Sequence, residues 1–138
     1  MADADIILAT LDEVTGRIGD PTPQVYERLF AEHPDLEPLF FMDSDGGVRG
    51  SMLQQCFECI IDAVGDKTLA KTILTSECDR HQGYDVPADT FWMFFTTIRD
   101  TFRDLLGTEW SASMEREWEG LLSELRATRT PERATQAA

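Results

Sequence analysis

Hydrophobic residues recur at helical spacing along most of the chain. Ile7, Leu11, Val14 and Ile18 follow one another at steps of three and four residues, and this spacing predicts an amphipathic first helix. The same spacing returns in the later segments, as far as Leu125. No segment shows a sustained alternation of apolar and polar residues, so we predict an all-α protein.

Capping and turn residues set the expected boundaries of these helices. Asp20-Pro21 predicts a helix start, because Pro is favoured in the first turn, and His33-Pro34 predicts a helix end. The loop 43–47 and the break 82–85 separate further helices. The expected helical segments are about 7–18, 21–33, 35–41, 49–64, 69–81, 87–107 and 111–125.

The expected helices are uneven in length and carry no heptad repeat. This pattern favours six to eight crossed helices over a parallel bundle. A length of 138 residues is typical of one domain. We predict a single domain over residues 1–126 and a disordered tail over residues 127–138, because the tail is polar and has no apolar face.

The charge of the chain narrows the range of partners. With 26 acidic and 12 basic residues, the formal net charge is -14, and such a surface repels phosphate backbones and anionic lipid heads. We therefore expect no nucleic-acid partner and no membrane partner. An odd number of cysteines and an acidic N-terminus without a signal-peptide pattern indicate a cytoplasmic protein.

Few residues suggest chemistry on their own. The two histidines are His33 and His81, and His81 ends an expected helix just before a break. A haem needs an apolar slot with one nitrogen donor on one side, and the chain has eight Phe and three Trp. Cys56 and Cys59 lack a following His and further ligands at zinc spacing, so we interpret both as small buried apolar residues.

Two stretches together resemble a known protein family. Residues 26–40 read YERLFAEHPDLEPLF, with an aromatic residue, LF, an HP turn and a second LF. Further along, His81, Val86, Phe91, Leu106-Gly107 and Trp118 follow in a similar order and spacing. Over roughly residues 3–126 the chain resembles the bacterial single-domain haemoglobins of the Vitreoscilla type, and it is similar to the haem domain of flavohaemoglobins.

This resemblance implies a globin fold around one pocket for haem b. His81 matches the residue that binds the iron, and Phe40 matches a Phe that packs flat on the haem. Tyr26 matches a Tyr that donates a hydrogen bond to the ligand on the iron. Val86 and Phe91 match residues on the proximal edge of the haem.

The sequence departs from the family on the helix opposite the iron-binding His. The family usually has Gln or His there, whereas residues 49–53 read RGSML. The preceding loop differs in length, so the distal residue is ambiguous between Arg49 and Gln55, and we take Met52 and Leu53 as haem contacts. Phe91 stands where flavohaemoglobins have a Tyr that touches the His. His33 matches a surface residue of the HP turn and is assigned no iron.

The resemblance implies a protein that reversibly binds a diatomic gas (O2, NO or CO), as in oxygen binding or transport. Two alternatives stay open: a globin-fold sensor or interaction module without haem, and NO dioxygenase or peroxidase-like activity with a separate reductase. We expect electrons to come from such a reductase, because the flavohaemoglobin reductase domain has no counterpart in these 138 residues. The oligomeric state is expected to be a monomer or a homodimer.

Overall fold

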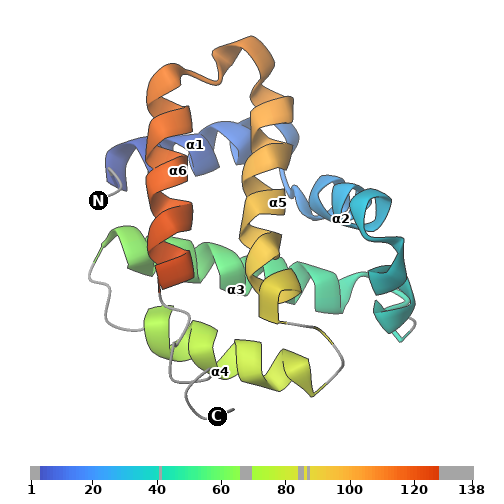
Figure 1. Cartoon of the computed structure of the whole chain (residues 1–138). Helices are drawn as coiled ribbons and strands as arrows, with labels where there is room; N and C mark the ends of the chain where they lie inside the picture. The colour runs from blue at the N-terminus through green and yellow to red at the C-terminus, as the bar shows by residue number, and fades with distance from the viewer. Residues whose placement is uncertain (1–3, 41, 66–69, 84–85, 87, 128–138) are drawn as a thin grey trace.

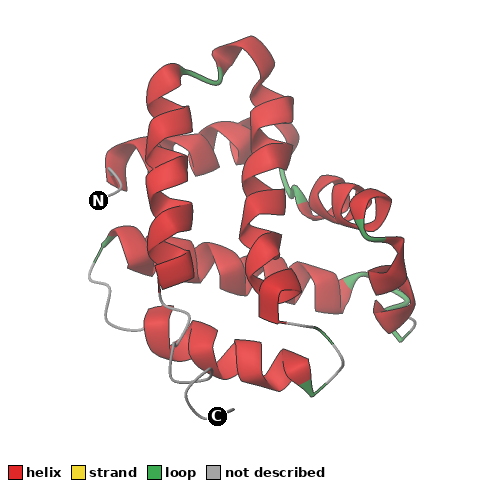
Figure 2. Cartoon of the chain, in the orientation of Figure 1, coloured by secondary structure: helices red, strands yellow, loops and turns green. Residues whose placement is uncertain are grey.

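The computed structural model describes residues 4–40, 42–65, 70–83, 86 and 88–127. All regular structure within these residues is helical, which confirms the all-α prediction (Figure 2). The elements are α1 (Ala4–Ile18), α2 (Thr22–Glu32), the 3-10 segment η1 (Pro34–Phe40), α3 (Gly47–Val64), α4 (Ala70–Gln82), α5 (Ala88–Leu106), the 3-10 segment η2 (Gly107–Glu109) and α6 (Ala112–Ala127).

The helices cross one another, as the uneven lengths predict. Helices α5 and α6 run side by side and are joined through η2, while α1 and α3 cross behind them (Figure 1). Helix α4 lies below α3 and packs against both α3 and α5. Helix α2 and η1 form the side of the molecule next to α5.

The hydrophobic core lies where α1, α3, α5 and α6 meet. Phe102 and Trp118 are both fully buried there, and their rings pack edge to face with centroids 6.0 Å apart. Leu53 and Ile60 of α3 belong to the same core, with exposed fractions of 1% and 0%. This packing fixes α3 against the body of the protein and leaves its opposite face toward α4.

Local sequence signals explain the helix boundaries, with small shifts. Helix α2 begins at Thr22, one residue later than expected, and the Asp20 carboxylate accepts the Thr22 N–H at 2.9 Å. Helix α3 begins at Gly47 rather than near residue 49. Helix α5 ends where Gly107 takes a positive φ of 54°, a conformation that favours Gly.

Some expected features fall on residues that the structure does not describe. These are the end of the short segment at Phe41, the helix start at Leu69, part of the break at 84–85, Pro87 and the tail from 128 to 138. Among the described helices, none has both the length and the apolar character that a membrane crossing requires.

Candidate functional site

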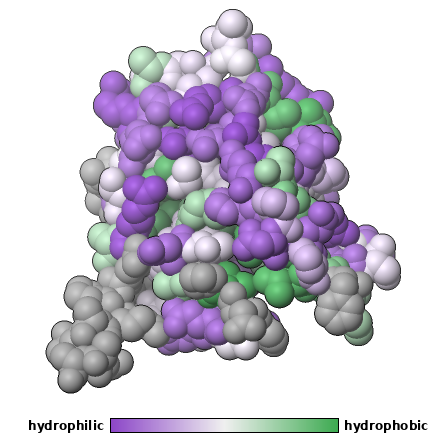
Figure 3. Space-filling model, turned by 45° about the vertical axis from the view of Figure 1, so that its right-hand side comes forward, coloured by the Kyte–Doolittle hydropathy of each residue, from purple (hydrophilic) through white to green (hydrophobic). Residues whose placement is uncertain are grey.

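A large cavity opens between α3 and α4. Its volume is about 820 Å³, within the range of cofactor and ligand pockets. In Figure 3, on a largely hydrophilic face, hydrophobic surface gathers low in the view around a hollow. The wall is mainly apolar and includes Leu29, Leu36, Leu39, Phe40, Met42, Val48, Met52, Ile73, Leu74, Val86, Phe91, Phe94 and Phe95.

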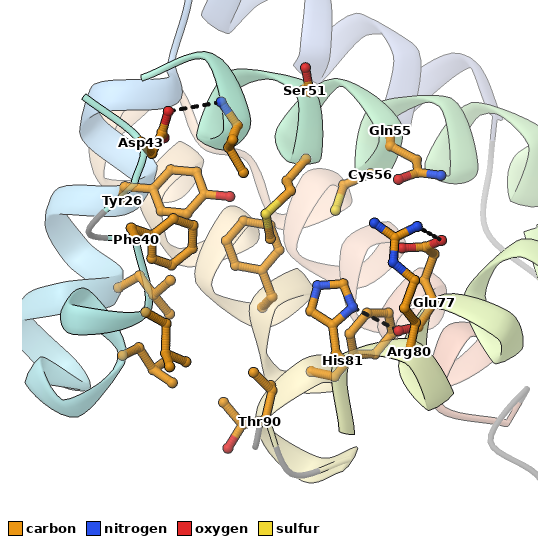
Figure 4. Close-up of a pocket in the computed structure, with 18 of the residues that line it drawn as sticks. Tyr26, Phe40, Asp43, Ser51, Gln55, Cys56, Glu77, Arg80, His81 and Thr90 are labelled. Atoms are coloured by element: carbon orange, nitrogen blue, oxygen red, sulfur yellow. Dashed lines mark hydrogen bonds and ion pairs between the residues drawn. The ribbon is translucent and has the colours of Figure 1, made fainter. Parts of the chain in front are cut away.

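His81 lies in the last turn of α4 and lines this cavity. Its ring Nδ1 is 2.7 Å from the backbone oxygen of Glu77, one helical turn earlier. A backbone carbonyl only accepts hydrogen bonds, so Nδ1 is the donor here, and in a neutral ring with this tautomer Nε2 has the lone pair. Figure 4 shows the ring reaching into the cavity from the α4 side. His81 therefore has the tautomer and the orientation of a metal ligand.

Phe91 and the chain after α4 hold the His81 ring in place. The ring centroids of His81 and Phe91 are 5.1 Å apart at an interplanar angle of 55°. The N–H of Val86 donates to the His81 carbonyl oxygen at 3.0 Å, which ties Val86 to the last turn of α4. Both Val86 and Phe91 line the cavity beside His81. The structure thus brings together the residues that the resemblance places on the iron-binding side.

Tyr26 enters the cavity from α2 within a group of aromatic rings. Its ring centroid lies 5.6 Å from that of Phe40, 5.8 Å from that of Phe30 and 5.4 Å from that of Phe94. Tyr26 is only 2% exposed. These contacts fix the ring, so the direction of its hydroxyl group is fixed as well.

The Tyr26 hydroxyl is a buried polar group without a hydrogen-bond partner within the described residues. Figure 4 shows it pointing into the cavity. Burial raises the pKa of Tyr26 well above its ordinary value, so the group stays protonated. A buried donor that bonds to nothing costs about 1–3 kcal/mol, which is the kind of cost that a bound ligand removes. The hydroxyl is thus ready to donate to a guest in the cavity.

Helix α3 forms one wall of the cavity, and it contains the residues 49–55 that the sequence left ambiguous. Met52 lines the cavity as expected, together with Ser51, Gln55 and Cys56. Leu53 lies instead in the hydrophobic core, one position further round the helix, so we correct its assignment as a haem contact. Sequence reasoning treated Cys56 as a core residue, although its helical phase with Met52 could have placed it on the wall.

His33 stays apart from the cavity wall. It forms the turn between α2 and η1, where its N–H donates to the Leu29 carbonyl oxygen at 2.7 Å. The backbone leaves the helical conformation at this residue, with φ -138° and ψ 71°, as expected for a residue before Pro. His33 therefore has a local structural role, and the cavity-lining histidine is His81.

Asp43 fixes the start of α3 at the edge of the cavity. Its buried carboxylate accepts the backbone N–H groups of Val48 and Arg49, each at 3.0 Å, and the Arg49 Nε at 2.9 Å. Burial alone would raise the pKa of Asp43, but these three donors outweigh it and lower the pKa below its ordinary value. The negative charge also matches the partial positive charge of a helix N-terminus.

Asp43→Asn should weaken the fold in a pH-dependent way. A carboxyl group whose pKa is lower in the folded chain than in the unfolded chain stabilises the fold at any pH above its unfolded-state pKa. This stabilisation is lost as the pH falls through the pKa of the folded state. We expect the variant to melt at a lower temperature at pH 7, with the difference from the parent protein shrinking below about pH 4. Thermal unfolding followed by circular dichroism measures this. A difference that is constant from pH 7 to pH 3 would contradict it, and Asp45→Asn on the exposed loop serves as the control.

The cavity residues lie within a segment that matches a known family. The model of the globin family matches residues 23–128. No curated protein and no solved structure matches the chain. The matched segment runs from the first turn of α2 past the end of α6, and so it contains every element that lines the cavity.

Proposed function

The chain belongs to the globin family, and on that premise we propose that it binds haem b through His81 and reversibly holds a diatomic gas, O2 or NO. We further propose that it is a globin of the bacterial single-domain type. The observation that carries the haem proposal is the His81 imidazole, whose Nδ1 is 2.7 Å from the Glu77 carbonyl oxygen while the rest of the ring lines an apolar cavity. Haem, when bound, would supply an iron centre that can bind a small gas.

The residues present suit a haem in size, polarity and donor set. A cavity of about 820 Å³ with a largely apolar wall excludes water from a flat hydrophobic ring system. Phe40 and Met52 supply parts of this wall, and Val86 and Phe91 supply others near His81. The orphaned Tyr26 hydroxyl gives one donor aimed at a guest, as the gas-binding side of the pocket requires.

Each side of the pocket has a separate task. On the α4 side, the Glu77 carbonyl oxygen holds the proton of His81 on Nδ1 and so keeps Nε2 available. On the opposite side, Tyr26 donates to a ligand that gains negative charge on binding, which slows its release. The apolar wall lowers the local dielectric and strengthens this hydrogen bond.

The test is the absorption spectrum of the purified protein. We expect a coloured protein whose dithionite-reduced form, free of gas, has the spectrum of five-coordinate iron, because the distal wall offers no imidazole: His33 lies outside the cavity. A low-spin, six-coordinate reduced form would contradict this, and the Met52 thioether would then be the first candidate for the sixth ligand. A colourless protein that also takes up no added haem would favour a haem-free interaction module.

A further inference from the structure

The distal wall carries a thiol as well as a hydroxyl. Cys56 lies on the face of α3 that lines the cavity, one helical turn after Met52. Figure 4 shows its side chain pointing into the cavity from the α3 side, while His81 enters from the α4 side. The Tyr26 hydroxyl points into the same space from α2. A hydroxyl group from α2 and a thiol from α3 therefore both point into the cavity that His81 enters from α4.

Both groups stay neutral. Burial raises the pKa of Cys56 far above its ordinary value, as it does for Tyr26. The two are close enough for a charge on Cys56 to raise the pKa of Tyr26 further. A thiol that stays protonated is a weak hydrogen-bond donor, and it is a poor metal ligand because metals bind the thiolate.

The orphaned Tyr26 hydroxyl indicates that this side of the cavity is built for a guest. It is a donor, it is 98% buried, and no described group accepts from it. The Cys56 thiol has no oxygen or nitrogen partner among the hydrogen bonds of the described residues either, whereas the Cys78 thiol accepts from Gln82 at 3.7 Å. Because both groups point into the same cavity, a guest there that accepts hydrogen bonds has a donor available from α2 and another from α3.

We propose that Cys56 is a second donor to the ligand that Tyr26 holds, so that the pair selects small ligands that only accept hydrogen bonds. This inference rests on the proposed haem function. The chemical class comprises O2 and small anions with charge on the outer atom, of which fluoride is the simplest. Because both side chains are protonated, each has a hydrogen that it can donate to such a ligand.

Fluoride binding to the ferric, haem-loaded protein tests the proposal. Cys56→Ala removes the donor, and we expect fluoride affinity to fall by roughly two- to tenfold, as for the loss of one modest hydrogen bond. Cys56→Ser keeps a donor of similar size, and its affinity should equal or exceed that of the parent protein. Cys78→Ala is the matched control, since its buried thiol lies outside the cavity wall.

Two further measurements separate donation from packing. With Tyr26→Phe and Cys56→Ala combined, fluoride affinity should show a non-additive change if both donate to one atom. Alkylation of Cys56 by iodoacetamide, followed by mass spectrometry, should be slower in the haem-loaded than in the haem-free protein. Equal fluoride affinity in the parent, Ala and Ser proteins would overturn the role of Cys56 while leaving haem binding intact. A protein that takes up no haem would overturn both proposals.

Discussion

His81→Ala should abolish haem retention or weaken it severely. Among the described residues that line the cavity, His81 is the imidazole, and with Nδ1 bound to the Glu77 carbonyl oxygen its Nε2 would be the nitrogen that holds the iron of the proposed haem. Changes to the outer partners of metal ligands cost about 10- to 100-fold in metal affinity, so loss of the ligand itself should cost more. Haem content per protein and the Soret band of the purified variant measure the effect.

Two variants distinguish ligation from a folding defect. His33→Ala removes the other histidine of the chain and should keep nearly normal haem content, because His33 lies in the turn after α2. His81→Gly opens space for free imidazole, which should restore the Soret band if the side chain acts as a ligand. A normal haem spectrum in His81→Ala, with helical content unchanged, would show that the assignment of His81 is wrong.

That His81, Val86 and Phe91 share one wall of a cavity could be predicted because few residues separate them along the chain. His81, Val86 and Phe91 follow one another within eleven positions, and the structure brings all three to one wall of the cavity. Tyr26 and Phe40 come from a single continuous motif, and their rings lie 5.6 Å apart. Residues that are close along the chain can take few positions relative to one another. When their spacing matches that of a family, their arrangement in space is therefore expected to match as well.

The distal wall could not be predicted in the same way, because α3 is apolar on two faces. Leu53 and Ile60 face the core, whereas Met52 and Cys56 face the cavity. A hydrophobic stripe shows that a face is buried, but it does not show whether protein or a ligand covers it. The loop before α3 differs in length from that of the family, so the positions of α3 could not be matched one by one. For this reason Leu53 was assigned to the cavity although it lies in the core, and Cys56 was missed.

The role of Asp43 at the start of α3 was not predicted from the sequence, for a related reason. Its loop has clear turn chemistry, but a capping side chain is usually sought two or three residues before the N–H group that it binds. The Asp43 carboxylate reaches five and six residues ahead, to Val48 and Arg49. That distance along the chain depends on how the loop folds back, which local patterns do not determine.

Tyr26→Phe should accelerate O2 release by one to two powers of ten. The hydroxyl is the strongest neutral donor on the distal wall, and a hydrogen bond to a partly charged acceptor contributes about 1.5–3 kcal/mol. Phe keeps the ring contacts with Phe40 and Phe94, so the shape of the pocket should change little. Stopped-flow measurement of O2 and CO dissociation tests this, because CO carries less charge and should respond far less. Equal changes for both gases would mean that Tyr26 only fills space.

Tyr26→Phe should stabilise the fold of the haem-free protein, although it should weaken the retention of O2 in the haem-loaded protein. No described residue accepts a hydrogen bond from the buried Tyr26 hydroxyl, and a buried donor without an acceptor costs about 1–3 kcal/mol. Tyr26→Phe removes the unsatisfied group and keeps the ring, so the free energy of unfolding of the haem-free protein should rise by up to that amount. Urea unfolding of both proteins measures it. A less stable variant would show that the hydroxyl already has a partner in the folded chain, whereas a gain in stability with a loss of O2 retention would identify Tyr26 as a residue whose hydroxyl serves the ligand rather than the fold.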